Sequence, residues 1–178
     1  MDLEYIYPGM RKGLGRPSEK DLRQVVQIAA ILFDNRKGEE LANFNVLTFP
    51  AYTEKLPSFF VELTGITQKE LFESGVDFEQ GFKKLEFFCR SHPIWTFDKD
   101  WGVLKQNCSY FGIHLSLPEF IRVKPKLAEW GLDPEKYSSG TLYQAVGLSM
   151  KGRVHNALHD VRSMAAAVNI LEKKDGSS

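Results

Sequence analysis

Hydrophobic and polar residues alternate along this chain in short blocks of two kinds. Apolar runs of strand length, bounded by polar residues, occur at 25–34, 92–97 and 121–123. The loosely alternating segment 41–49 follows a turn at 35–38 and predicts a hairpin with the first run. Helical spacing of apolar residues predicts helices over 78–89, 100–110, 141–146 and 156–171. Strands come first and then alternate with helices, which predicts an α/β fold with a mixed sheet flanked by helices.

Composition places the chain among ordinary globular proteins. Its 178 residues are 43% hydrophobic and 26% charged, which excludes a disordered chain, a collagen-like repeat and a disulfide scaffold. We expect a single domain over 1–172 and a flexible polar tail over 173–178. No apolar run approaches the roughly 20 residues of a membrane span, and the acidic start lacks the features of a signal peptide. Cys89 and Cys108 are expected to be buried thiols, so a cytoplasmic protein is predicted.

The charge balance limits how the chain could bind nucleic acid. Lys plus Arg is 23 and Asp plus Glu is 23, so the formal net charge is zero. This disfavours a protein that coats nucleic acid through bulk positive charge. It is compatible with an enzyme that grips a few phosphates locally and whose carboxylates are neutralised by metal ions.

Several acidic residues lie beside the predicted strands and helix starts. Asp2 and Glu4 are two residues apart, which places both on one face of a strand, where they repel each other unless a cation lies between them. Asp100 begins a predicted helix, and Asp160 lies in the first turns of the last helix, five residues after His155. Each one alone is better explained by a structural role, for example by the preference of Asp for a helix N-terminus.

In this order, the residues resemble the motifs of the DEDDh (DnaQ-like) 3′→5′ exonucleases of the ribonuclease H-like superfamily. The family's Asp-x-Glu, Asp and His-x4-Asp motifs are matched by Asp2-Leu3-Glu4, by Asp100 and by His155 with Asp160. Two other stretches also match, VVQIAAILFD at 25–34 and LTGIT at 63–67. The segments Gly152–His155 and Trp101–Cys108 are most similar to the branch that includes the histone-mRNA and small-RNA exonucleases.

The resemblance implies a fold, a cofactor and a reaction. The fold is ribonuclease H-like, with one five-stranded mixed sheet whose second strand is antiparallel to the rest. The cofactors are two divalent ions, Mg²⁺ or Mn²⁺. Asp2, Glu4 and Asp160 would hold the ion that binds the nucleophilic water. Asp2 would bridge to the second ion, Asp100 would bind directly or through water, and His155 would be the general base. The partners are 3′ ends of single-stranded RNA or DNA, and the products are nucleoside 5′-monophosphates.

Residues near the matching motifs are candidates for substrate binding. Aromatic candidates for base stacking are Tyr5, Phe59, Phe60 and Trp101. Leu63, Thr64 and Gly65 are expected to line the pocket for the terminal nucleotide. Basic residues that either contact phosphate or are solvated surface charges are Arg11, Lys12, Arg16, Lys105, Lys151 and Arg153.

Two local alternatives concern the site itself. Asp98 competes with Asp100 for the second motif, and Asp100 is preferred because residues 101–104 then begin the family's next helix. His155 and His159 have the i, i+4 spacing of a zinc HExxH motif, but Asn156 stands where that motif needs Glu. His159 is therefore assigned to a supporting position or to the surface.

Two functions follow, an active exonuclease and a catalytically weak module that keeps the fold and binds nucleic acid or a partner. The complete set of five motif residues favours the enzyme. The module is favoured by the single residue, Met1, that precedes Asp2, where the family usually has several apolar residues. The choice between RNA and DNA stays open, as does the choice between a monomer and the homodimer frequent in related families.

Overall fold

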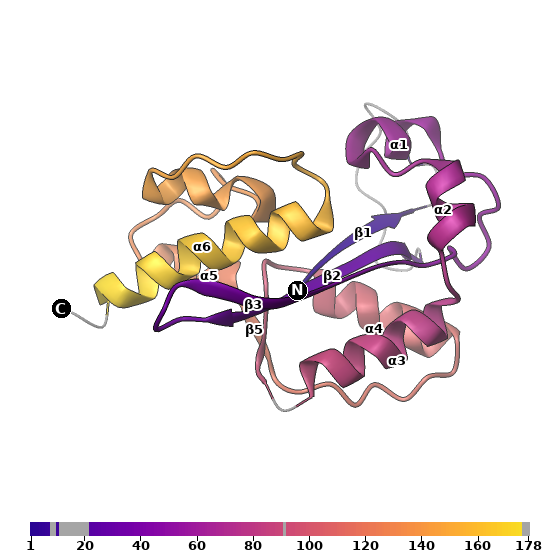
Figure 1. Ribbon diagram of the computed structural model, residues 1–178, viewed down its shortest axis with the longest axis horizontal. Coiled ribbons are helices and arrows are strands. Elements are labelled where there is room, and N and C mark those ends of the chain that lie inside the picture. Colours follow the sequence, from indigo (N-terminus) through magenta and orange to yellow (C-terminus); the bar gives the residue numbers. More distant parts are fainter. Residues whose placement is uncertain (8–9, 11–21, 91, 176–178) are drawn as a thin grey trace.

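The computed structural model describes residues 1–7, 10, 22–90 and 92–175. Strands β1 (Asp2–Ile6), β2 (Gln24–Asp34) and β3 (Glu39–Leu47) form an antiparallel sheet in that order, and β4 (Ile94–Thr96) pairs in parallel with β5 (Phe120–Arg122). The helical elements are α1 (Ser58–Thr64), α2 (Gln68–Ser74), α3 (Phe78–Cys89), α4 (Asp100–Tyr110), α5 (Val123–Glu129), the 3-10 helix η1 (Ser139–Val146) and α6 (Ala157–Asp175). Helices α3 and α4 lie on one side of the strands, and α6 with its neighbours lies on the other (Figure 1).

The predicted α/β class is confirmed and β2 is antiparallel to both β1 and β3, but the single five-stranded sheet is wrong. The described residues form five strands in two sheets, of three and two strands. The amino group of Met1 donates a hydrogen bond to the Trp95 carbonyl at 2.7 Å, and this bond joins the start of β1 to β4. Among the described residues β1 is paired only with β2, and β4 only with β5, so this bond does not extend into a ladder between the sheets.

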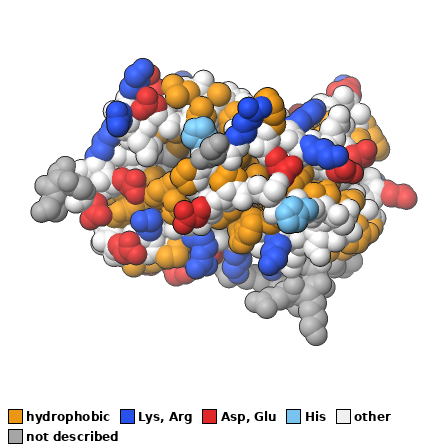
Figure 2. Space-filling model, turned by 90° about the horizontal axis from the view of Figure 1, so that it is seen from below, with side chains coloured by type: hydrophobic (Ala, Val, Ile, Leu, Met, Phe, Trp, Pro, Cys, Tyr) orange, Lys and Arg blue, Asp and Glu red, His pale blue; other side chains and the backbone are white. Residues whose placement is uncertain are grey.

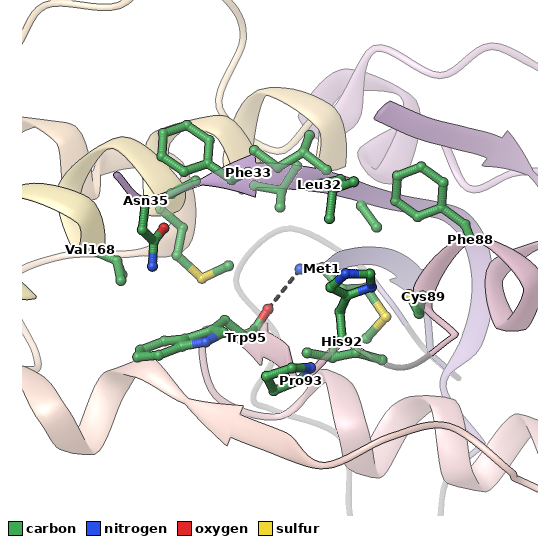
Figure 3. A pocket seen from close by; sticks show the side chains of 16 residues that line it. Met1, Leu32, Phe33, Asn35, Phe88, Cys89, His92, Pro93, Trp95 and Val168 are labelled. Carbon is green, nitrogen blue, oxygen red and sulfur yellow. Dashed lines mark hydrogen bonds between the residues drawn. The ribbon is translucent and has the colours of Figure 1, made fainter. Parts of the chain in front are cut away.

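An apolar cavity of about 240 Å³ lies between the end of β2 and β4. Figure 3 shows Leu32 and Phe33 on one side, Pro93 and Trp95 on the other, and the bond from Met1 between them. None of the four candidate carboxylates lines this cavity. The cavity is therefore separate from the candidate site.

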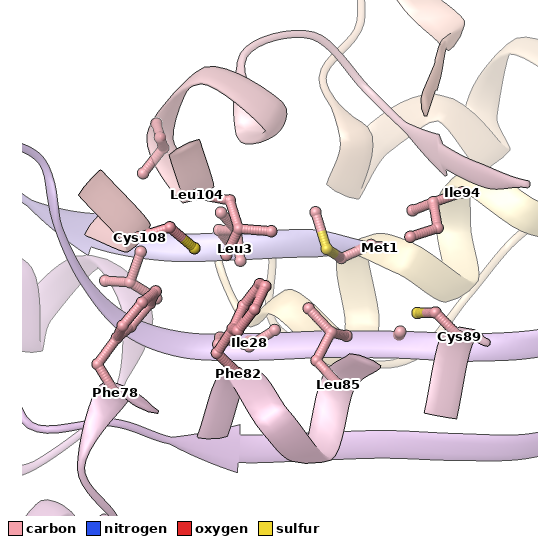
Figure 4. Packing of buried hydrophobic residues seen from close by; sticks show 13 residues of the cluster. Met1, Leu3, Ile28, Phe78, Phe82, Leu85, Cys89, Ile94, Leu104 and Cys108 are labelled. Atoms are coloured by element: carbon pink, nitrogen blue, oxygen red, sulfur yellow. The ribbon is translucent and has the colours of Figure 1, made fainter. Parts of the chain in front are cut away.

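Helix α3 has the predicted bounds because its apolar residues recur on one face. Phe78, Phe82, Leu85 and Cys89 are buried and pack against Leu3 and Ile28 of the sheet (Figure 4). The prediction of two buried thiols is confirmed, since Cys89 and Cys108 are both free and buried. Helix α6 continues to Asp175, four residues beyond its predicted end at 171, so residues 173–175 of the predicted tail are helical.

Three helices of seven residues each, α1, α2 and α5, were not among the predicted elements. Helix α2 carries a sequence signal that could have found it. The Thr67 hydroxyl accepts the backbone N–H of Glu70, and the Glu70 carboxylate accepts the backbone N–H of Thr67, which makes a capping box.

The surface shows no single dominant charge on the face seen in Figure 2, where acidic and basic side chains are interspersed with hydrophobic ones. This agrees with the zero net charge of the chain. Among the helices of the described residues, none combines the length and the apolar character that crossing a membrane requires.

Gln27 fastens helix α6 to the sheet. It lies on β2 opposite Glu4 of β1, and it is 2% exposed. Its Oε1 accepts the N–H of Ala157, the first residue of α6, at 3.0 Å, and its Nε2 donates to Asn45 Oδ1 at 2.9 Å. One buried amide thus satisfies a helix N-terminus and sets where α6 begins on the sheet.

We predict that Gln27→Leu lowers the free energy of unfolding by about 1–3 kcal/mol, because Ala157 N–H and Asn45 lose their buried partner. Urea denaturation measures the change. The exposed Gln80→Leu is the control and should stay within about 0.5 kcal/mol of the parent. Equal stabilities of the two variants would contradict the role given to Gln27.

Candidate active site

Four buried carboxylates come together where β1, α4 and α6 meet. Asp2 and Glu4 are two residues apart in β1, so their side chains lie on the same face of the strand, the face that α6 covers. Asp160 lies in the first turn of α6, and Asp100 is the first residue of α4. The exposed fractions are 5% for Asp2, 8% for Glu4 and Asp100, and 2% for Asp160.

His155 completes this arrangement. Ligand atoms of Glu4, His155 and Asp160 lie within 4.8 Å of one another. The backbone N–H of His155 donates to Asp160 Oδ2 at 3.3 Å, which places the imidazole beside the carboxylates. His155 has φ +65°, a left-handed conformation that is uncommon outside glycine and is found at functional sites.

Burial shifts the proton affinities of all these groups. Desolvation, with repulsion from the other carboxylates, raises the pKa of Glu4 to about 8 and holds that of Asp2 well above its usual range. Desolvation also raises the pKa of Asp160 to about 7 and of Asp100 to about 6. It lowers the pKa of His155, which favours the neutral imidazole.

The donor set fits a hard divalent cation. Asp160 Oδ2 accepts from His155 N–H and, at 3.5 Å, from the Ser139 hydroxyl. Its Oδ1 is buried without a hydrogen-bond partner among the described residues, which leaves a lone pair for another ligand. Carboxylate oxygens are the ligands that Mg²⁺ and Mn²⁺ prefer, and a cation would offset the unfavourable burial and the mutual repulsion of these negative charges.

The Asp160 carboxylate packs directly against Gly140 of η1, in the space that a side chain at position 140 would fill. A Cβ at Gly140 would lie 2.7 Å from Asp160 Cγ and closer still to Oδ1. Any larger residue there would therefore push this carboxylate aside. No local pattern predicts this contact, because the two residues belong to different helices, η1 and α6.

The geometry favours Asp100 over Asp98 as the second-motif residue. Asp100 is buried and contributes to the raised pKa of both Asp2 and Glu4. The side chain of Asp98 is 28% exposed and faces Arg122 at 3.9 Å. Asp98 thus lies at the rim, beside a positive charge of its own.

The candidate substrate-binding residues separate into accessible and buried ones. Phe60 is fully buried in the cluster with Ile6 and Val26, so the expectation that it stacks on a base is wrong, whereas Phe59 is only half-buried. Thr64 is also buried, and its hydroxyl donates to the Phe60 carbonyl. Half-buried Leu63 and Gly65 stay at the surface of the turn.

Two other aromatic candidates pack on the protein. Tyr5 is half-buried and contacts the core cluster that α3 and α4 cover. Trp101 packs on Phe120, with ring centroids 4.2 Å apart. The loop cations Arg11, Lys12 and Arg16 lie outside the described residues.

His159 is buried rather than at the surface. It is 8% exposed and meets the Tyr143 ring edge-on. A Cβ at Gly152 would lie 2.9 Å from its Cε1, so the loop before α6 packs directly on this imidazole. His159 therefore supports the segment that carries His155.

Comparison with known proteins decides the family. The model of the RNase_T family, described as exonuclease, matches residues 12–168. The chain belongs to this exonuclease family. The DEDDh resemblance is thereby confirmed. The family match begins after β1, so Asp2 and Glu4 lie ahead of it.

Solved exonuclease structures share the fold at low identity. The nuclease domain of 3′hExo, a DEDDh family member bound to rAMP, has a TM-score of 0.82 at 16% identity, covering 97% of this chain and 90% of that one. Cell-death related nuclease 4 (CRN-4) has a TM-score of 0.75 at 14% identity, covering 97% and 62%. Exonuclease I of E. coli, in complex with a dA16 oligonucleotide, has a TM-score of 0.64 at 18% identity, covering 85% and 37%. No curated protein matches the sequence significantly.

We predict that the stability of the metal-free exonuclease falls as pH rises. The folded-state pKa values of about 6 to 8 exceed the unfolded values near 4, so the fold binds more protons and loses stability through that window. Divalent ions bind the ionised form, and at a hundredfold excess over Kd they should add about 2.7 kcal/mol. Thermal melts in EDTA and in Mn²⁺ from pH 5 to 8.5 measure both effects. A flat EDTA profile with no gain from Mn²⁺ would contradict the cation site.

We predict that Gly140→Ala weakens Mn²⁺ binding roughly 10–100-fold, because the methyl group displaces the Asp160 carboxylate. Isothermal titration calorimetry measures the affinity. Gly102→Ala is the matched control, since nothing lies within 4 Å of a Cβ added in that helix. Unchanged affinity in Gly140→Ala would show that Asp160 binds no ion.

Proposed function

We propose that this chain is a metal-dependent 3′→5′ exonuclease that hydrolyses single-stranded RNA or DNA to nucleoside 5′-monophosphates. The observation that carries the proposal is the cluster of Glu4, His155 and Asp160, with the buried Asp2 and Asp100 electrostatically coupled to it, on an exonuclease-family fold. Structural neighbours support the substrate class, since one binds a dA16 oligonucleotide and another recognises the 3′ end of a histone mRNA stem-loop. The cytoplasmic location and the homodimer stay predictions.

The carboxylates would divide between two ion positions. Asp2, Glu4 and Asp160 would hold one ion, and Asp2 with Asp100, directly or through water, would hold the other. When bound, two divalent ions lower the pKa of a water molecule and neutralise the charge that develops on the phosphodiester oxygens. Asp160 suits this arrangement because its Oδ1 has no other partner in the described part of the chain.

His155 takes the proton from the attacking water. Burial lowers its pKa, so the imidazole is neutral and able to accept a proton at neutral pH. The water oxygen bonds to phosphorus, and the bond to the 3′ oxygen of the preceding nucleotide breaks. The leaving 3′ oxygen takes a proton from solvent, so the shortened strand ends in a 3′ hydroxyl, and the phosphate leaves with the released nucleotide.

The terminal nucleotide is held by the turn after α1. Leu63 and Gly65 reach its surface, and Phe59 is the half-buried aromatic next to them. Phe60 and Thr64 are buried below this turn and support it from the protein interior. Tyr5 and Trp101 extend the accessible aromatic surface on the side of β1 and α4.

Labelled strands test the activity and its direction. Single-stranded RNA and DNA, labelled at the 3′ or the 5′ end, are incubated with Mg²⁺, Mn²⁺ or EDTA. We expect metal-dependent release of the 3′ label as mononucleotide, and a ladder of shortening strands with the 5′ label. Binding without release would identify a catalytically weak module instead of an enzyme.

We predict that His155→Ala lowers the single-turnover rate about 10²–10⁴-fold while substrate affinity changes little, because the proton moves only in the transition state. His159→Ala should lose far less, since His159 packs against Tyr143 and Gly152 and supports the loop. The parent rate should also fall at acidic pH as the imidazole is protonated. Equal losses in the two variants would refute the assignment of His155 as the base.

A further inference from the structure

The loop 147–156, between η1 and α6, carries His155 and is anchored at several points. Gly152 packs on His159, and the backbone N–H of His155 donates to Asp160. Between them, the side chain of Arg153 reaches a different part of the fold. Its Nε donates to the Leu63 carbonyl at 3.2 Å, and its Nη2 donates to the Glu62 carbonyl.

These two carbonyls belong to the last turn of α1, where a helix leaves its acceptors without intrahelical donors. The Val61 carbonyl of that turn has a partner close in sequence, since the Gly65 N–H donates to it. Arg153 supplies the donors for the Glu62 and Leu63 carbonyls from about 90 residues away. Guanidinium is suited to this because two of its N–H groups point in one plane toward adjacent acceptors.

Gly65 makes room for the guanidinium. It has φ +81°, and a Cβ there would lie 3.1 Å from Nη1 of Arg153. The turn that follows α1 and the loop that carries His155 are therefore in direct contact through Arg153. This contact occupies a side chain that the sequence offered as a phosphate ligand.

We propose that Arg153 is a positioning residue that fixes the His155 loop against the turn of residues 62–65, so that the general base and the terminal-nucleotide pocket keep one relative position. The inference rests on the proposed exonuclease function for the meaning of both segments. The contact itself is a property of the fold and does not depend on turnover.

Activity measurements distinguish positioning from phosphate binding. We expect Arg153→Ala to lower kcat about 10–100-fold in single-turnover assays, because a misplaced base reacts slowly even in the bound complex. Arg153→Lys should recover only part of the rate, since an ammonium cannot donate along both directions of the guanidinium. A rise in KM with unchanged kcat would overturn the proposal and make Arg153 a phosphate contact.

The matched control is Arg162→Ala. Arg162 also donates two hydrogen bonds, to Glu40 at 2.7 and 2.8 Å, but it ties α6 to β3. Its loss should leave kcat within twofold of the parent at a temperature where both proteins are folded. A loss equal to that of Arg153→Ala would show a general stability effect and overturn the assignment.

Hydrogen exchange tests the contact without substrate or metal. In Arg153→Ala, amide exchange should rise together in residues 63–66 and in 153–156, because both segments lose the same anchor. Arg153→Lys carries this test if the alanine variant does not fold. Faster exchange in only one segment would overturn the proposal. If the chain releases no nucleotide, the exchange result still decides whether Arg153 couples the two segments. A failure of the proposed exonuclease function is therefore distinguishable from a failure of the role proposed for Arg153.

Discussion

Four carboxylates buried against one another are the constraint on which the rest of this structure depends. Burial removes these charges from water, and this desolvation raises the pKa of Asp2, Glu4, Asp100 and Asp160; repulsion within the cluster adds to the shifts of Asp2, Glu4 and Asp160. Three separate elements must nevertheless hold them together. The fold achieves this by surrounding the cluster with apolar packing on both sides of β1 and β2.

Buried amides tie the elements that carry the carboxylates to the central strand. Gln27 of β2 bonds the start of α6, which holds Asp160. Asn107 of α4 accepts the N–H of Val25 and donates to the carbonyl of Arg23, which fixes the helix that Asp100 begins. Each carboxylate-bearing helix thus has its own polar anchor on or next to β2, so its position does not depend on hydrophobic contact alone.

Local patterns were enough to predict most of the regular structure. The strands at 24–34 and 39–47 and the helix at 78–89 follow from alternation and helical spacing within each segment. The motif residues were also recognisable, and the structure brings Glu4, His155 and Asp160 together. Seven-residue helices such as α1 contain too few turns to show a clear period.

The features that the sequence did not predict depend on contacts between segments that are distant along the chain. Whether β1 and β4 share a ladder is decided by where two short strands overlap, which no local pattern records. The burial of Phe60 and the exposure of Phe59 depend on how α1 sits on the sheet. The close packing of Gly152 against His159, and of Gly140 against Asp160, likewise cannot be predicted from the local sequence.

The left-handed backbone at His155 also bears on how this protein can evolve. Asparagine tolerates that conformation better than most residues, and a single base change converts a histidine codon to an asparagine codon. Such a change would remove the imidazole while the loop kept its path. Under the role proposed for His155, a lineage can therefore lose the general base in one mutational step and retain a folded chain.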